Sequence, residues 1–286
     1  PVAAAGAMID TLPLERWEGR RAVELAREWG VPGVHLFASV GSTNDVARWL
    51  GDEGAPSGSV VLAEEQTAGR GRSGRSWASA PGLGLWLSVL LRPTAAPNLA
   101  LTPLWVGLAV ARALERFVAP LHPQIKWPND ILLDGRKAAG ILCEGSWESD
   151  QRLAVVAGLG VNVLHTRADF PPELQPLATS LVLAGAPELS RLQLAGALVR
   201  EVLELAGSAP AELGGPFAAE LRARDALFGQ AVTLGGPGAA ELEGVAEGIA
   251  PDGALRVRAA DGALHEVRSG SVLRYGSPEP RRLPID

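Results

Sequence analysis

Apolar residues fall into separate runs along this chain, and the period of each run predicts a strand or a helix. Three runs are nearly continuous in β-forming residues, so we expect strands at 60–63, 85–91 and 153–163. Three longer runs repeat apolar residues at helical spacing, so we expect helices at 14–29, 103–118 and 190–206. A chain of 286 residues with this pattern can bury a substantial core.

A short apolar run at 34–38 predicts another strand, and the residues after it lead into a helix that ends near Leu50. The connecting residues are Gly41-Ser42-Thr43-Asn44-Asp45, and four of them are good helix N-caps. Hydroxyl and backbone N–H groups at a helix N-terminus also bind polar ligands. Capping alone and ligand binding are therefore equally good interpretations of this segment.

From about Gly229 the pattern changes to short apolar runs separated by turns. The runs lie at 231–234, 242–249, 254–258 and 264–267. The turns between them are Gly235-Gly236, Asp252-Gly253 and Asp261-Gly262. This spacing predicts a small antiparallel β-barrel, with a domain boundary near residue 228.

The composition is that of an ordinary globular protein, with 47% hydrophobic and 20% charged residues. The net charge is −6, whereas a dedicated nucleic-acid-binding protein is usually basic. The sequence has no long uninterrupted apolar stretch and no recognisable signal peptide. We therefore expect a cytoplasmic protein that does not associate with membranes.

Cysteine and histidine are too sparse to predict a disulfide or a zinc site. Cys143 is the single cysteine, and its apolar neighbours favour a buried hydrophobic side chain over a nucleophile. The four histidines are scattered without metal-binding spacing, so we expect no zinc.

The densest positive charge lies between Gln66 and Trp77, where residues 69–75 contain three arginines and three glycines. Apolar runs precede and follow this segment, so it is predicted to be a loop between two strands. Glycine lets backbone approach a ligand closely, and the planar fork of arginine suits phosphate or carboxylate. The loop is predicted to be mobile and to fold over an anion; a solvated linker or an RGG-like nucleic-acid tract is the alternative.

A second polar segment, Gln124 to Asp130, precedes a predicted β-hairpin with the two-residue turn Asp134-Gly135. Asn129 and Asp130 ahead of an apolar strand are suited to binding Mg²⁺ or ribose. A solvated strand end with lysine–aspartate pairing is the alternative. Lys137 lies early on the second strand of this hairpin.

Five segments together resemble the biotin protein ligase family: Gly41-Ser42-Thr43-Asn44, Gln66 with the loop Gly69–Trp77, Lys126–Asp130, Arg136-Lys137 with Gly140-Ile141-Leu142, and Gly158–Asn162. The match spans roughly residues 35–165, and the order GRGRxGRxW then KWPND is highly specific. The resemblance implies an α+β fold, with a central mixed β-sheet flanked by helices and an SH3-like C-terminal β-barrel. The expected parts are an N-terminal extension and helix (1–33), a catalytic domain (34–228), the barrel (229–276) and a tail (277–286).

Members of this family use Mg²⁺ and ATP to convert biotin to biotinyl-5′-AMP, and they then transfer biotin to a lysine of a carrier domain, as in acetyl-CoA carboxylase. By position, the resemblance implies that Lys137, Arg72 and Asp130 are catalytic and that Asp130 binds Mg²⁺. The implied biotin site contains Ser42, Thr43, Asn44, Gln66, Gly69, Arg70, Gly71, Arg72, Lys137 and Gly140. The implied ATP and adenylate site contains Arg70, Arg72, Arg75, Trp77, Lys126, Asn129, Lys137 and Asn162.

About 34 residues precede the first predicted core strand, which is too few for the helix-turn-helix domain of the bifunctional members. We therefore expect a monofunctional ligase that does not bind DNA, and the resemblance also makes a homodimer an expectation. Two alternatives stay open. One is a lipoate ligase, which shares the fold and the adenylate chemistry but not the GRGRxGRxW loop. The other is a non-catalytic regulator that binds a ligand or nucleic acid.

Overall fold

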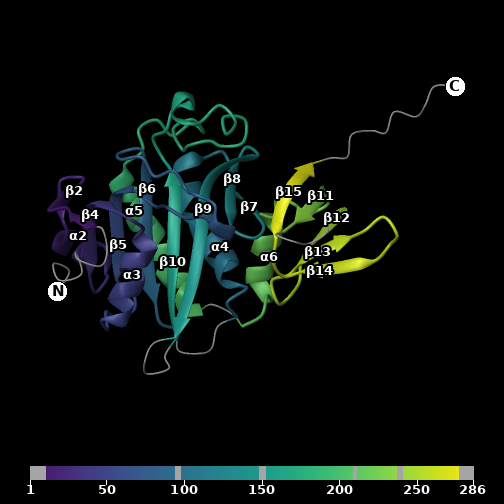
Figure 1. Cartoon of the computed structure of the whole chain (residues 1–286), viewed down its shortest axis with the longest axis horizontal. Coiled ribbons are helices and arrows are strands. Elements are labelled where there is room, and N and C mark those ends of the chain that lie inside the picture. Colours follow the sequence, from purple (N-terminus) through teal and green to yellow (C-terminus); the bar gives the residue numbers. More distant parts are fainter. Residues whose placement is uncertain (1–10, 94–97, 148–152, 209–210, 237–240, 277–286) are drawn as a thin grey trace.

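The computed structural model describes residues 11–93, 98–147, 153–208, 211–236 and 241–276. A large unit is built on an eight-stranded sheet, and a small unit on a five-stranded sheet lies beside it (Figure 1). No helix in these residues is long and apolar enough to cross a membrane. The mixed sheet with helices on both faces and the small antiparallel C-terminal sheet confirm the predicted α+β fold.

The large sheet has the strand order β1-β4-β5-β6-β10-β9-β8-β7. Its strands are β1 (Thr11–Pro13), β4 (Val34–Val40), β5 (Val60–Gln66), β6 (Gly84–Leu91), β7 (Gln124–Lys126), β8 (Asp130–Leu133), β9 (Arg136–Trp147) and β10 (Leu153–Asn162). β4 and β5 are parallel, and every other neighbouring pair is antiparallel. β8 and β9 form the predicted hairpin, because Asp134 and Gly135 adopt the positive φ values, 50° and 70°, of a tight two-residue turn.

Side chains alternate between the two faces of the sheet, and both faces are apolar over much of their area. In β5, Val60 and Leu62 join one core, whereas Val61 and Ala63 join the other. The helices of the large unit are α2 (Ala22–Trp29), α3 (Thr43–Asp52), α4 (Thr102–Val118) and α5 (Arg191–Ser208). α2, α4 and α5 cover the first face, and α3 covers part of the second (Figure 1). Burial on both faces explains the nearly continuous apolar runs.

Where α3 does not cover the second face of the large sheet, β9 and β10 have glycines on that face. An ideal Cβ atom at Gly158 of β10 would lie 2.1 Å from Asn44 Oδ1, so glycine is needed for the N-terminus of α3 to approach the sheet. Gly160 follows on the same face and pairs directly with Gly140 of β9. These glycines leave room above the sheet next to the start of α3.

The first predicted helix is shorter than expected. A small hairpin, β2 (Arg16–Trp17) and β3 (Arg20–Arg21), precedes α2. Glu18 and Gly19 form its turn with φ values of 48° and 76°, and helical periodicity alone could not reveal this turn. Trp17 is buried in the main core, so this segment packs with the large sheet.

The small sheet has the strand order β14-β13-β12-β11-β15 and is antiparallel throughout. Its strands are β11 (Ala231–Gly235), β12 (Leu242–Ile249), β13 (Leu255–Arg258), β14 (Leu264–Val267) and β15 (Ser271–Gly276). Four strands match the predicted runs, but β15 and the helix α6 (Gly215–Ala223) had no prediction. β15 combines buried Val272 with exposed Leu273, which is too weak an apolar signal to identify a strand. The domain boundaries stay predictions.

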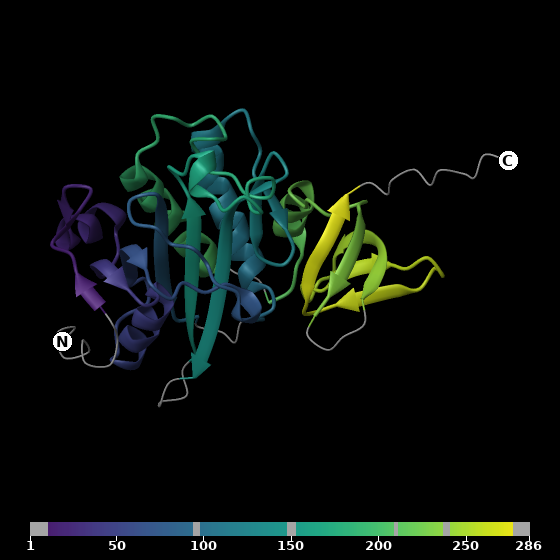
Figure 2. The same cartoon turned by 45° about the horizontal axis from the view of Figure 1, so that its top comes forward.

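The two units meet through β15 and the turn that contains Gly253. In Figures 1 and 2, β15 is the strand of the small sheet nearest the large sheet. Tyr275 Oη donates to the Gly135 carbonyl at 3.2 Å, and Trp127 Nε1 donates to the Gly253 carbonyl at 3.1 Å. Trp127 is buried, so this side chain packs between the units and does not enter a ligand site.

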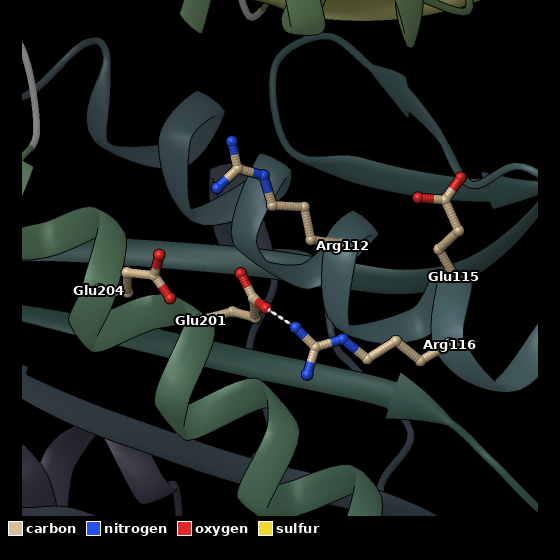
Figure 3. A pocket seen from close by; sticks show the side chains of 5 residues that line it. All are labelled: Arg112, Glu115, Arg116, Glu201 and Glu204. Atoms are coloured by element: carbon tan, nitrogen blue, oxygen red, sulfur yellow. Dashed lines mark hydrogen bonds and ion pairs between the residues drawn. The ribbon is translucent and has the colours of Figure 1, made fainter.

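A charged groove of about 450 Å³ lies over α4 and α5, on the helical side of the molecule (Figure 3). Glu201 is only 5% exposed, and it forms an ion pair with Arg116. Arg112 forms an ion pair with Glu220 of α6 at 2.5 Å. Because a buried carboxylate is costly without a partner, we assign these charges to holding the helices together.

Candidate active site

One cavity of about 520 Å³ on the second sheet face collects nearly all the predicted site residues. Those that line it are Ser42, Thr43, Asn44, Gln66, Arg70, Gly71, Arg72, Arg75, Trp77, Lys126, Asn129, Asp130, Lys137, Gly140 and Asn162. The exception is Gly69, whose ideal Cβ atom would lie 2.5 Å from the Trp77 carbonyl. Gly69 is therefore explained by a close approach within its own loop. The structure thus brings these residues together in one cavity, and their assignment as site residues stays a prediction.

The N-terminus of α3 forms a rigid polar end of the cavity. Ser42 is the N-cap residue but makes no capping hydrogen bond, so capping alone does not account for it. Thr43 donates its N–H and its hydroxyl to Gln66 Oε1, at 2.9 and 3.1 Å. Gln66 Nε2 donates to Ser79 Oγ at 2.8 Å. These bonds fix the orientation of the Gln66 amide toward the helix.

The buried hydroxyl of Ser88 orients the Asn44 side chain at this end of the cavity. Ser88 of β6 is fully buried and donates to Asn44 Oδ1 at 2.7 Å. Asn44 Nδ2 donates in turn to Glu144 Oε2 at 2.6 Å and to the Leu142 carbonyl at 3.2 Å. Ser88 was not predicted as a site residue, although a single hydroxyl inside the apolar run 85–91 was an available signal.

The Trp77 indole rests on the backbone of β9 and β10. Ideal Cβ atoms at Gly140 and Gly160 would lie 2.8 and 2.7 Å from this ring. Lys137 Nζ lies over the same ring, 5.0 Å from its centroid, which is a cation–π distance. The two glycines thus leave room for the Trp77 ring. The biotin contact of Gly140 stays a prediction, and Gly160 was not predicted as a site residue.

Lys137 and Asp130 form the closest ion pair in the cavity, with 2.5 Å between Lys137 Nζ and Asp130 Oδ1. The backbone of Lys137 is held on both sides. Its N–H donates to the Leu177 carbonyl at 2.8 Å, and its carbonyl accepts from the Thr179 N–H at 2.9 Å. The predicted lysine and aspartate are therefore adjacent and firmly placed.

Residues 66–77, here called the lid, form a hairpin with a bridge between Arg70 and Ser76. Its arginines Arg72 and Arg75, together with Lys126, donate to three successive residues of the C-terminal unit, 270–272, at 3.3, 3.3 and 3.5 Å. Within the described residues, none of these three cations forms an ion pair. Burial lowers the pKa of Arg72 and of Lys126, so an anionic ligand would be favoured beside them.

Arg70 lines the cavity but is bound to another side chain of the protein, and its contact with a ligand stays a prediction. Its guanidinium forms a two-pronged bond to Asp45 of α3, with both distances at 2.6 Å. Hydrogen bonding from Arg70 holds the pKa of Asp45 below its ordinary value, so the pair is charged on both sides. Arg70 is thus already paired, because Asp45, the last residue of the predicted helix-capping segment, faces the lid.

The two predicted asparagines use their amide nitrogens to support backbone. Asn129 Nδ2 donates to the Ile141 carbonyl at 2.7 Å. Asn162 Nδ2 donates to the Thr179 carbonyl at 3.0 Å. Both side chains line the cavity, and their nucleotide contacts stay predictions.

Part of the cavity wall was not predicted from the sequence. The additional lining residues include His165, Phe170, Leu174, Leu177, Leu273 and Tyr275. The His165 and Phe170 rings stack with 5.2 Å between centroids, and burial lowers the pKa of His165. This side of the cavity is mainly apolar, and the proline-rich loop and β15 that form it carry no clear periodicity.

Two further expectations concern Cys143 and metal clusters. Burial raises the pKa of the Cys143 thiol, which disfavours the nucleophilic thiolate. Among the described residues, no group of three or more His, Cys, Asp or Glu side chains is placed to hold a metal ion.

Comparison with known proteins agrees with this geometry. The Biotin/lipoate A/B protein ligase family matches residues 36–162, and the Biotin protein ligase C terminal domain matches residues 227–275. A biotin--[acetyl-CoA-carboxylase] ligase from Mycobacterium tuberculosis is 35% identical over 247 residues, which cover 83% of each chain. This chain belongs to the biotin protein ligase family.

The length over which this chain aligns differs between members of the biotin protein ligase family. The bifunctional ligase/repressor BirA of Bacillus subtilis is 42% identical over 166 residues, which cover 56% of this chain and 50% of that protein. The match thus spans about half the length of this relative. The structure of a biotin protein ligase from Aquifex aeolicus in complex with biotin and ATP has a TM-score of 0.71 at 28% identity, covering 83% of this chain and 96% of that chain.

Proposed function

We propose that this chain is an ATP-dependent biotin ligase. It would convert biotin to biotinyl-5′-AMP and transfer biotin to a lysine of a biotin carboxyl carrier domain of acetyl-CoA carboxylase. The observation that carries the proposal is the charge of the cavity, which four cationic side chains line together with Asp130: Arg72, Arg75, Lys126 and Lys137. Joining a carboxylate to a triphosphate brings two anions together, and fixed cations offset their repulsion.

The first step forms a bond between a biotin carboxylate oxygen and the α-phosphorus of ATP. The bond from that phosphorus to the bridging oxygen breaks, and pyrophosphate leaves with the electron pair. Lys137, fixed through its backbone, would stabilise negative charge on the carboxylate and the α-phosphate. In the second step a carrier lysine amine attacks the acyl carbon, loses a proton and displaces AMP.

Asp130 would hold Mg²⁺ together with the phosphates of ATP. Mg²⁺ commonly keeps several water ligands and binds through one or two carboxylates plus substrate phosphates. Among the described residues, Asp130 is one of two carboxylates that line the cavity, the other being Asp169, and one carboxylate beside cations that face the phosphates meets that requirement. The ion would neutralise charge on the phosphates.

The proposal is tested by incubating the protein with Mg²⁺, ATP and either biotin or lipoate, followed by mass spectrometry of the acyl-adenylates. We expect biotinyl-5′-AMP. Lipoyl-5′-AMP alone would show a lipoate ligase, and the absence of any adenylate together with salt-sensitive DNA binding would show a non-catalytic regulator.

Replacing Arg72 by glycine should release the intermediate. We expect Arg72→Gly to raise labelling of bystander lysines about tenfold, because the lid loses a cation that faces the adenylate phosphate. The label should be followed on an added lysine-rich protein, since Lys126 and Lys137 are the only lysines of this chain. Unchanged selectivity would remove Arg72 from the lid's function.

Replacing Ser88 by alanine should weaken biotin binding. We expect about a tenfold rise in the biotin Kd by calorimetry, because Asn44 Oδ1 loses a buried donor, at a cost of about 1–3 kcal/mol. Ser59→Ala is a matched control, because Ser59 is also buried and its hydroxyl, among the described residues, donates to the Pro56 carbonyl alone, at 2.8 Å. Equal weakening in both variants would contradict a specific role for Ser88.

Three expectations stay predictions: a cytoplasmic location, a homodimer and the absence of DNA binding. Gel filtration and a DNA-binding assay on the same preparation address the last two.

A further inference from the structure

The base of the lid is held by backbone hydrogen bonds. The N–H groups of residues 67 and 68 donate to the carbonyls of Val40 and Gly41, at 2.9 and 2.8 Å. The Trp77 N–H donates to the Gly69 carbonyl at 2.8 Å, which joins the two strands of the hairpin. A side chain that fixes this base therefore also fixes the segment that ends at Trp77.

The three lid arginines differ in their partners. Arg72 and Arg75 line the cavity, and their acceptors among the described residues are neutral: the Gly270 carbonyl for Arg72, and Ser271 Oγ and the Arg72 carbonyl for Arg75. Arg70 points to α3, where its two terminal nitrogens bind both oxygens of Asp45 at 2.6 Å. A two-pronged arginine–carboxylate bond is directional as well as charged, so it restricts the position of the lid.

The pair between Arg70 and Asp45 belongs to a network that reaches the biotin end of the cavity. Glu144 lies 3.8 Å from Arg70 and 3.0 Å from Arg48. The same carboxylate oxygen that faces Arg70 accepts the Asn44 amide at 2.6 Å. The network thus links the lid to α3 and β9, and two positive charges balance two negative ones.

Resting on the function proposed above, we propose that the ion pair between Arg70 and Asp45 is a latch that holds the lid closed over the acyl-adenylate. Asp45 is then a positioning residue that touches no reacting atom. It acts by keeping the base of the lid on α3, and so slows escape of the intermediate before the carrier lysine arrives. Closure is set in part by the chain's own charges and does not depend only on the ligand.

The test is the rate at which bound biotinyl-5′-AMP leaves the protein, measured by chasing radiolabelled adenylate with unlabelled adenylate. We expect Asp45→Asn to raise this rate about fivefold, which corresponds to ~1 kcal/mol. Formation of the adenylate should change less than about twofold, because residues that face the phosphates are intact. Labelling of an added lysine-rich protein should rise with the escape rate.

A double-mutant cycle separates the latch from general damage. Arg70→Gln should raise the escape rate about as much as Asp45→Asn does, and the double variant should release the adenylate no faster than either single variant. Arg48→Gln is the matched control, because Arg48 contacts Asp45 and Glu144 but not the lid. An unchanged escape rate in Asp45→Asn, additive effects in the double variant, or an equal effect of Arg48→Gln would each overturn the proposal.

Limited trypsin digestion gives a readout that does not depend on the proposed function, because trypsin cleaves after the lid arginines. We expect faster cleavage after Arg72 and Arg75 in Asp45→Asn than in the wild type, with matching thermal unfolding showing that the fold is intact. If the wild-type protein makes no biotinyl-5′-AMP, the proposed function is refuted, but the digestion experiment still tests the latch. Identical cleavage rates would refute the latch alone.

Discussion

Lys137→Ala should lower the rate of biotinyl-5′-AMP formation by about 10²–10³-fold while the protein stays folded. Lys137 is the cation paired with Asp130 at 2.5 Å, and its backbone is fixed by two hydrogen bonds. Removing one fixed donor from a site that stabilises developing negative charge commonly has an effect of this size. The measurement is single-turnover adenylate formation at saturating biotin and ATP.

Two controls define the role of Lys137. Thermal unfolding should show that the variant is folded, since the side chain is partly exposed and the β9 backbone bonds remain. Lys137→Arg should recover part of the rate, because it keeps the charge but not the geometry of the ammonium group. Turnover near that of the wild type in Lys137→Ala would remove this lysine from the mechanism.

Gly160→Ala should lower adenylate formation about 100-fold. The added Cβ atom would lie 2.7 Å from the Trp77 ring, so the ring must move away from β10 by a distance on the order of 1 Å. Trp77 is the last residue of the lid and lies next to Lys137, so displacing its ring disturbs the charged part of the cavity. Trp77 fluorescence should change together with the rate.

Gly33→Ala is the matched control for Gly160→Ala. Its added Cβ atom would meet only the His35 ring, at an ordinary contact distance of 3.6 Å, and Gly33 does not line the cavity. We expect nearly unchanged activity. A similar loss in both variants would indicate that an added methyl group lowers activity wherever it is placed, and would contradict the specific role of the glycines beneath Trp77.

Local patterns were sufficient to predict much of the fold. Continuous apolar runs identified β5, β6 and β10, because both faces of these strands are covered. The Asp134-Gly135 turn was predictable because its residues suit positive φ. By contrast, the Glu18-Gly19 turn was hidden inside a run with helical spacing, and β15 exposes side chains that a buried strand would hide.

The site was predictable where sequence motifs identify residues and unpredictable where folding brings distant residues together. The lid and the segment before β8 were recognised as polar, glycine-rich or charged interruptions between strands. Arg70 and Asp45 are 25 residues apart, and Arg72 and Gly270 are 198 apart. Neither contact has a local signal, because each depends on how α3 and the C-terminal unit pack around the sheet.

Glycines in strands were a partial signal. Gly158 and Gly160 interrupt an otherwise apolar strand, and glycine at such positions commonly marks a close approach. The sequence does not say what approaches. The structure assigns Asn44 to Gly158 and Trp77 to Gly160, so one strand accommodates both the start of α3 and the end of the lid.

The central claim is that this cavity joins a carboxylate to ATP and then acylates a carrier. Its most direct test is a pyrophosphate-release assay with Mg²⁺ and ATP, in which biotin is added first and a purified biotin carboxyl carrier domain second. We predict one equivalent of pyrophosphate when biotin is added, followed by continuous release and biotinylation of a single carrier lysine once the carrier is present. Release that does not depend on biotin, or a carrier that remains unmodified, would contradict the account.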